Sequence, residues 1–179
     1  MRIMNKQIYL DHAATTDVLP EVRDAMLPYL SDDFGNASAS YELGEHAHLV
    51  LEEAREKIAH CIGAKPSEIY FTSGGSESDN WAIKNTAGEQ KTIGKHVITS
   101  KIEHHAVLHS LRALEKEGYE VTYLDVDKDG IVDMDQLKNS IRQDTILISI
   151  MYANNEIGTI QPIKEIGQIC RERKVLFHT

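Results

Sequence analysis

Short runs of β-branched and other apolar residues alternate along the chain with longer stretches in which apolar residues recur every three or four positions. The short runs predict buried strands, and the longer stretches predict amphipathic helices. Strands are expected over residues 68–72, 96–100, 120–124, 145–151 and 175–178. Helices are expected from residue 20 and over residues 43–61, 78–85, 105–117, 134–142 and 163–173. This order predicts an α/β fold with a mostly parallel sheet flanked by helices.

The helix expected over residues 43–61 has a distinct apolar face and a distinct end. The positions expected to point inward are Leu51, Ala54, Ile58 and Ala59. Gly63 follows the last helical position, where glycine commonly ends a helix.

Composition narrows the class of protein. The 179 residues are 41% hydrophobic and 26% charged, which is typical of a soluble globular protein. The net charge of -9 and the lack of Lys and Arg clusters argue against nucleic-acid or membrane-surface partners. No apolar run approaches the ~20 residues that cross a bilayer, and the first residues lack the apolar block of a signal peptide. A cytoplasmic location is therefore expected.

The two cysteines, Cys61 and Cys170, lie far apart in helical patterns. Neither has a second cysteine at the spacing of a metal site or a disulfide framework. Both are therefore expected to be buried core thiols.

A glycine-rich segment, residues 71–78, lies between a predicted strand and a predicted helix. Gly74 and Gly75 would let backbone N–H groups approach an anion, the helix start adds partial positive charge, and the Ser76 hydroxyl adds a donor. The same residues also make an ordinary helix cap without a ligand. No Lys follows the glycines as in a Walker loop, and Ser78 occupies the position where a serine-nucleophile elbow needs glycine.

The segment Glu103-His104-His105 follows the strand expected over residues 96–100. A histidine there could stack on an aromatic cofactor or move protons near neutral pH. Simple exposure, shared with His109, is the alternative. Zinc is disfavoured because the adjacent histidines point in different directions and no Cys or carboxylate partner recurs at ligand spacing.

Asn154 and Asn155 follow another predicted strand and could donate hydrogen bonds to a ring oxygen, or could simply form a turn. With the two previous segments they would lie at the carboxyl ends of three strands, on the edge where open α/β sheets bind ligands. The alternating carboxylates of residues 125–129 imitate a calcium loop. Gln136 replaces its last ligand and a strand pattern precedes it, so a solvated turn is predicted.

Taken together, four blocks resemble the cysteine desulfurases, class V members of the fold type I pyridoxal-phosphate enzymes. The blocks are residues 9–16, 72–78, 103–108 and 154–158. The resemblance implies that Gly75 and Ser76 hold the phosphate of pyridoxal 5'-phosphate (PLP). It further implies that His104 stacks on the pyridine ring and shares in acid-base catalysis, that Asn155 bonds the phenolic oxygen, and that Asn36 binds the substrate carboxylate.

The resemblance also implies a reaction and partners. L-cysteine would give L-alanine and an enzyme persulfide, which supplies sulfur for iron-sulfur cluster or thio-cofactor assembly. A homodimer and a sulfur-acceptor or scaffold protein are expected as partners. Residues 1–16 would form an N-terminal arm, and residues 17–179 an incomplete N-terminal part of the PLP-binding large domain.

Two departures from the family pattern bear on function. Residues 35–41 read Gly-Asn-Ala-Ser-Ala-Ser-Tyr, where the family usually has Gly-Asn-Pro-Ser-Ser-x-His, and this affects the role of Asn36. The chain also stops within a predicted strand. The resemblance places after Thr179 the Asp that pairs with the pyridine nitrogen, the Schiff-base Lys and the nucleophilic Cys. A piece of a longer enzyme, inactive by itself, is therefore expected.

Two other functions remain open on the residues. One is a class V aminotransferase, or a lyase acting on selenocysteine or by β-elimination. The other is a fragment without catalytic activity that only binds a partner.

Overall fold

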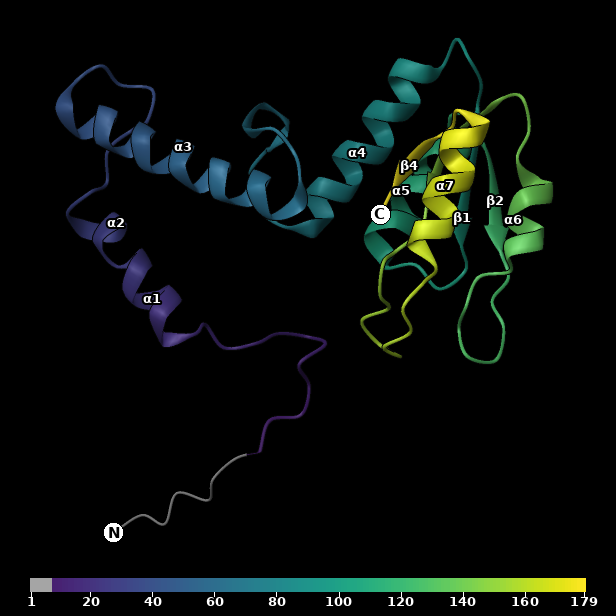
Figure 1. The fold of residues 1–179 in the computed structure, drawn as a ribbon, viewed down its shortest axis with the longest axis horizontal. Helices are drawn as coiled ribbons and strands as arrows, with labels where there is room; N and C mark the ends of the chain where they lie inside the picture. The colour runs from purple at the N-terminus through teal and green to yellow at the C-terminus, as the bar shows by residue number, and fades with distance from the viewer. Residues whose placement is uncertain (1–7) are drawn as a thin grey trace. The chain divides into compact units, whose positions relative to one another are not determined.

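The computed structural model describes residues 8–179 (Figure 1), and the chain divides into two compact units between Phe71 and Thr72. The sequence-based boundary between an arm and a large domain at residue 16 stays a prediction. In the part that the structure describes, no helix is long and apolar enough to cross a membrane.

The first unit is helical. Its elements are α1 (Pro20–Met26), α2 (Pro28–Ser31), α3 (Glu42–Ile62) and the 3-10 turn η1 (Pro66–Glu68). Pro28 separates α1 from α2, and Gly63 ends α3 in the left-handed conformation, at φ 69°. Ala59 is buried, but Leu51 and Ile58 are 36% and 40% exposed, so the predicted inward face is wrong at those two positions. The pattern identified an apolar face, but this unit supplies no surface that covers all of it.

The strand predicted over residues 68–72 is also wrong. Residues 66–68 form η1, and the chain then runs to Phe71 without pairing to a strand. Arg55 takes the place of a strand partner: its Nε donates to the Ile69 carbonyl at 3.2 Å, and its guanidinium lies 5.2 Å from the Phe71 ring centroid. A β-branched run becomes a strand only where a neighbouring backbone accepts its hydrogen bonds.

The second unit is built on a four-stranded parallel sheet in the order β2-β1-β3-β4. The strands are β1 (His96–Ser100), β2 (Glu120–Leu124), β3 (Thr145–Ser149) and β4 (Leu176–His178). All four were predicted, and β3 ends two residues early. The α/β fold with a parallel sheet flanked by helices is therefore confirmed.

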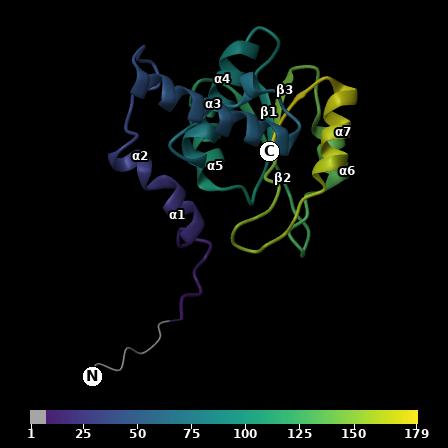
Figure 2. The same cartoon turned by 60° about the vertical axis from the view of Figure 1, so that its left-hand side comes forward.

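Helices cover both faces of this sheet, as Figure 2 shows. They are α4 (Gly75–Gln90), α5 (His105–Lys116), α6 (Met134–Ser140) and α7 (Ile163–Arg173). Val97 and Leu147 pack with α4 and α5, whereas their neighbours Ile98 and Ile148 pack with α6 and α7. Because successive side chains of a strand point to opposite faces, each strand contributes to both cores.

The two cysteines have different surroundings. Cys170, on α7, is buried in the core as predicted, but Cys61 is exposed, so the prediction of a buried thiol is wrong for Cys61. Cys61 is two residues beyond the buried Ala59, and residues two apart on a helix do not share a face.

The acidic segment after β2 forms a turn held by its own side chains. Asp127 Oδ1 accepts hydrogen bonds from the N–H groups of Asp129 and Ile131, both at 2.9 Å. Asp125 pairs with Lys101, and the predicted turn is therefore confirmed.

Candidate functional site

The carboxyl ends of β1, β3 and β4 border a cavity of about 160 Å³, at the edge where parallel sheets bind ligands. The residues that line it are Asp79, Glu103, His104, Val107, Ser149, Ile150, Met151, Tyr152, His178 and Thr179. Of the residues predicted for cofactor binding, His104 is part of this lining. Gly75, Ser76 and Asn155 belong to the same unit but do not line the cavity.

The turn before α4 is folded by its own side chains. Glu77 Oε2 accepts hydrogen bonds from the backbone N–H and the hydroxyl of Ser73, both at 2.6 Å. These bonds hold the pKa of Glu77 below its usual value. The hydroxyls of Thr72 and Ser78 are 2.7 Å apart. These bonds hold the turn, but Gly74, the N-cap residue of α4, has no side-chain cap hydrogen bond, so the helix cap considered as an alternative is not formed.

The turn leaves the donors of Gly75 and Ser76 unused. Neither N–H group, nor the Ser76 hydroxyl, donates to any of residues 8–179. A Cβ placed on Gly74 or Gly75 would meet nothing within 4 Å, so there is open space beside the start of α4. Three free donors at the start of a 16-residue helix suit a phosphate group. The structure therefore fits the phosphate of PLP at this point.

His104 has a structural role besides any catalytic one, because it is the N-cap of α5. Its Nδ1 accepts a hydrogen bond from the N–H of Ala106 at 3.1 Å. An accepting Nδ1 places the proton of the neutral imidazole on Nε2. The exposed ring is thereby held in one orientation with Nε2 available. The neighbours His105 and His109 stack on each other instead, with ring centroids 5.4 Å apart.

Glu103 is the residue whose importance the sequence did not reveal. Its side chain is 6% exposed, and Oε1 accepts hydrogen bonds from Met151 N–H at 2.8 Å and from the Ser100 hydroxyl at 3.0 Å. Burial raises the pKa of this carboxyl to about 6. A Glu beside two histidines suggests an exposed polar loop, and no local signal shows that this side chain turns inward.

Three further polar residues meet at the cavity wall. Ser149 Oγ lies 2.8 Å from His178 Nδ1, and His178 Nε2 lies 3.6 Å from Asp79 Oδ1. Burial lowers the pKa of His178. Ser149 is itself buried, so it supports the histidine and is not presented as a nucleophile. Sequence reasoning missed this group because its members come from α4, β3 and β4.

The two asparagines after β3 have different environments. Asn154 is buried, and its Oδ1 accepts hydrogen bonds from the N–H groups of Glu156 and Ile157, at 2.8 and 3.0 Å. Asn155 is exposed, and its Nδ2 donates to Glu156 Oε1 at 3.2 Å. The turn considered as an alternative is therefore what Asn154 forms. The amide of Asn155 remains accessible to a ligand.

Asn36 belongs to the first unit and is exposed there. Its Oδ1 accepts a hydrogen bond from the Ser38 N–H at 2.9 Å, which closes a local turn. The binding of a substrate carboxylate by Asn36 stays a prediction.

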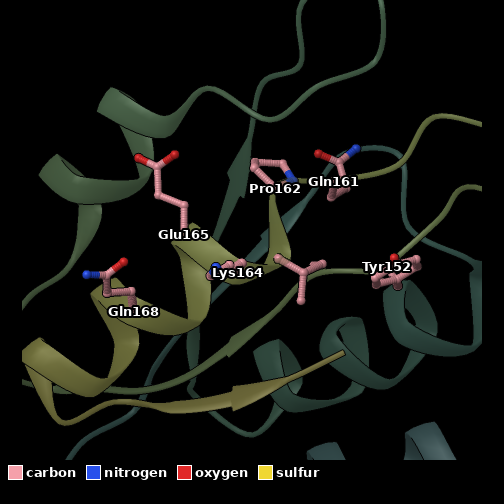
Figure 3. A pocket seen from close by; sticks show the side chains of 7 residues that line it. Tyr152, Gln161, Pro162, Lys164, Glu165 and Gln168 are labelled. Carbon is pink, nitrogen blue, oxygen red and sulfur yellow. The ribbon is translucent and has the colours of Figure 1, made fainter.

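A larger hollow, about 420 Å³, lies at the start of α7 (Figure 3) and is distinct from the predicted site residues. Two of its polar side chains already have partners. Gln161 donates to the Gly130 carbonyl at 2.7 Å and accepts from the Val132 N–H at 3.0 Å, and Glu165 lies 3.5 Å from Lys138. The cavity at the strand ends is the better candidate site, because it contains His104 and lies at the ligand-binding edge of the sheet.

The second unit is an α/β structure with polar residues at the carboxyl edge of its parallel sheet, which is the edge where such sheets bind ligands. Residues 8–179 match the aminotransferase class-V family, and the chain belongs to that family.

Two curated relatives illustrate the similarity. The chain is 60% identical over 175 residues to the cysteine desulfurase IscS of Methanosarcina thermophila, covering 98% of this chain and 43% of that protein. It is 57% identical over 176 residues to the cysteine desulfurase IscS of Dictyoglomus turgidum, covering 98% and 45%. The chain thus spans less than half the length of these relatives.

Solved structures agree with the sequence matches. A NifS-like protein superposes with a TM-score of 0.93 at 39% identity, over 96% of this chain and 48% of that one. SspA in complex with cysteine gives a TM-score of 0.91 at 45% identity, over 96% and 49%.

Proposed function

We propose that this chain supplies the amino-terminal part of a PLP-dependent cysteine desulfurase. L-cysteine and an enzyme thiol would give L-alanine and an enzyme persulfide. The observation that carries the proposal is the 60% identity, over 98% of the chain, to a protein named cysteine desulfurase. The free donors at the start of α4 and the His104 ring at the strand ends support it.

The phosphate of PLP would bind at the start of α4. The N–H groups of Gly75 and Ser76 and the Ser76 hydroxyl would each donate to a phosphate oxygen, and the partial positive charge of the helix start would stabilise the anion. Glu77 would keep the preceding turn in place, since its carboxylate is already bonded to Ser73.

The residues after β1 and β3 would orient the rest of the cofactor. His104 would lie against the pyridine ring, and the exposed amide of Asn155 would donate to the phenolic oxygen. Bound PLP supplies an electron sink for the bonds around the substrate α-carbon. Nε2 of His104 carries a proton and is not used by the helix cap, so it would hold or move a proton beside the substrate.

The remaining assignments rest on the family resemblance. Asn36 would bind the substrate carboxylate. We further propose a cytoplasmic homodimer that passes sulfur to an acceptor or scaffold protein for iron-sulfur cluster assembly. None of residues 1–179 supplies the pyridine-binding Asp, the Schiff-base Lys or the nucleophilic Cys of the resemblance, so this chain alone is expected to be inactive.

The decisive experiment uses the full-length gene product that carries this chain. Purified protein is incubated with PLP, L-cysteine and a thiol reductant, and alanine, sulfide and pyruvate are measured. Equal amounts of alanine and sulfide are expected. Pyruvate and ammonia in place of alanine would identify a β-elimination lyase, and no PLP binding would leave a partner-binding protein. Residues 1–179 assayed in parallel should produce no alanine.

The role of His104 is tested in the same assay. His104→Gln preserves a hydrogen-bonding side chain but removes the titratable ring, so alanine formation should fall by ~10²-fold or more. His105→Gln is the matched control, since that ring stacks on His109 away from the cavity. Equal losses of alanine formation in both variants would show that His104 is simply an exposed histidine without a catalytic role.

A further inference from the structure

Two buried side chains join the loop after β1 to the loop after β3, and each bond runs from one loop to the other. Glu103 Oε1, on the first loop, accepts from the N–H of Met151, on the second, at 2.8 Å. Asn154 Nδ2, on the second loop, donates to the carbonyl of Ile102, on the first, at 2.8 Å. The two contacts are reciprocal, because each loop offers one side chain and one backbone group.

The sheet brings these loops together. β1 and β3 are parallel neighbours with Thr99 opposite Ser149, so the two strands end at the same edge of the sheet. The Thr99 hydroxyl also donates to the Ser149 carbonyl at 2.9 Å. The strands therefore fix the start of each loop, and the two side-chain bonds fix the residues that follow.

The residues that these bonds hold are the immediate neighbours of the proposed cofactor contacts. Glu103 precedes His104, whose ring is fixed by the Ala106 N–H, and Asn154 precedes Asn155. A shift of one loop against the other would change the distance between the His104 ring and the Asn155 amide. Neither Glu103 nor Asn154 needs to touch the cofactor to have this effect.

We propose that Glu103 and Asn154 form a clasp that sets the spacing of His104 and Asn155, and that both act as positioning residues for PLP. This inference rests on the proposed function. The clasp consists of the Glu103–Met151 and Asn154–Ile102 hydrogen bonds.

The use of a carboxylate at this point supports a positioning role. Glu103 is 6% exposed, and burial raises its pKa to about 6, so the carboxyl is still mostly ionised at neutral pH. A charged acceptor makes stronger hydrogen bonds than a neutral one, which holds the Met151 N–H more firmly. Groups with perturbed pKa values concentrate at functional sites.

The test compares four variants of the full-length gene product. Glu103→Ala removes the acceptor, whereas Glu103→Gln keeps an oxygen that can accept from Met151. Asn154→Asp keeps an acceptor for the Glu156 and Ile157 N–H groups but cannot donate to Ile102. Ser110→Ala is the matched control, since it deletes a buried hydrogen bond to the Ala106 carbonyl on α5, outside the clasp.

PLP affinity and the absorbance band of bound PLP are measured together with hydrogen exchange at the Met151 amide. Misplacement of positioned groups by ~1 Å can slow a reaction by ~10²-fold, so a smaller loss is expected for binding alone. Glu103→Ala and Asn154→Asp should bind PLP ~10-fold or more weakly, with a shifted band, and Glu103→Ala should also expose the Met151 amide. Glu103→Gln should recover affinity to within ~3-fold of wild type, and Ser110→Ala should bind like wild type although it is less stable.

The outcomes separate the clasp from the proposed function. Wild-type protein that binds no PLP would overturn the proposed function and the role of the clasp with it. Wild-type binding together with unchanged affinity in Glu103→Ala and Asn154→Asp would overturn the clasp alone. If Ser110→Ala loses as much PLP affinity as the clasp variants, the loss is due to general destabilisation and the clasp is overturned. If Glu103→Ala does not fold, Asn154→Asp decides the question.

Discussion

The two units of this chain bury their apolar residues to very different extents. In the second unit both faces of the sheet carry a packed core, and residues such as Ile98, Leu111 and Ile148 are fully buried. In the first unit, the buried positions within the helices are Gly44 and Ala59. Exposed apolar side chains such as Leu30 and Ile62, at 74% and 68%, are frequent there.

This difference shows what an apolar pattern can and cannot establish. Both units have apolar residues at helical spacing, but only the second contains the strands and helices that cover them. A sheet with helices on both faces completes its core with its own segments. The first unit exposes apolar side chains that a further protein surface could cover. The chain spans 43% of the length of a relative, which agrees with this exposure.

The largest expected effect is on stability. Ile98→Ala removes a fully buried side chain from β1 and should lower the free energy of unfolding by ~2–5 kcal/mol. Ile58→Ala, on α3, removes a side chain that is 40% exposed and should cost less than ~1 kcal/mol. Urea unfolding is followed by far-UV circular dichroism, which reports on the helices of both units, and by the fluorescence of Trp81, which lies on α4 in the second unit. Similar losses in the two variants would show that the first unit has a core of its own.

Thiol reactivity should also distinguish the units. Cys61 is exposed on α3, whereas Cys170, on α7, is buried and burial raises its pKa to about 11. The thiolate is the reactive form, so a thiol reagent should modify Cys61 at least ~10²-fold faster than Cys170 at pH 7.5. Mass spectrometry of quenched samples gives both rates, and the Cys61→Ser variant isolates the slow one. Fast modification of Cys170 would mean that the core of the second unit opens readily.

A pH-dependent effect of about 2 kcal/mol is expected at Glu103. Its folded-state pKa of about 6 lies above the ordinary 4.5, so the folded protein binds the proton more tightly than the unfolded chain. The associated stability is complete below about pH 4.5 and is lost as pH rises through 6, with a total loss of about 2 kcal/mol.

The difference between wild type and Glu103→Gln isolates this contribution, because the lowered pKa of half-buried His178 changes stability with the opposite sign. Urea unfolding at pH 5 and pH 7.5 should show wild type losing stability relative to Glu103→Gln at the higher pH. Glu53→Gln, on exposed α3, is the control and should change stability by less than ~0.5 kcal/mol at both values. A constant difference between wild type and Glu103→Gln would contradict the raised pKa.

The smallest expected effect concerns the start of α4. Ser76→Ala removes an exposed hydroxyl without a partner among the described residues, so stability should hardly change. PLP affinity of the full-length gene product should fall by ~10-fold, the loss expected for one charge-assisted hydrogen bond. Ser38→Ala, in the first unit, serves as the control and should not affect affinity. Unchanged affinity in Ser76→Ala would remove that hydroxyl from the phosphate site.

Sequence reasoning found the strands and helices of the second unit accurately. It did not find the side-chain contacts that join distant segments of that unit. β1, β2 and α7 have the predicted bounds because periodic apolar patterns with glycine or lysine ends are local signals. The same reasoning placed Gly75, Ser76, His104 and Asn155 at one edge of the predicted sheet. The structure has all four in the second unit. Sequence reasoning did not find the roles of Glu103 and His178, because their partners Met151 and Asp79 are 48 and 99 residues distant in the chain.

The sequence by itself determined the alternation of strands and helices, the glycine-rich start of α4 and the placement of polar residues after each strand. These features depend on side-chain periodicity and on residues with special backbone freedom, which neighbouring positions encode. Only the tertiary structure decided which apolar faces are covered, that residues 68–72 do not pair as a strand, and that Glu103 turns inward to hold Met151. Burial and strand pairing depend on surfaces contributed by distant segments, and no local pattern specifies whether such a surface is present.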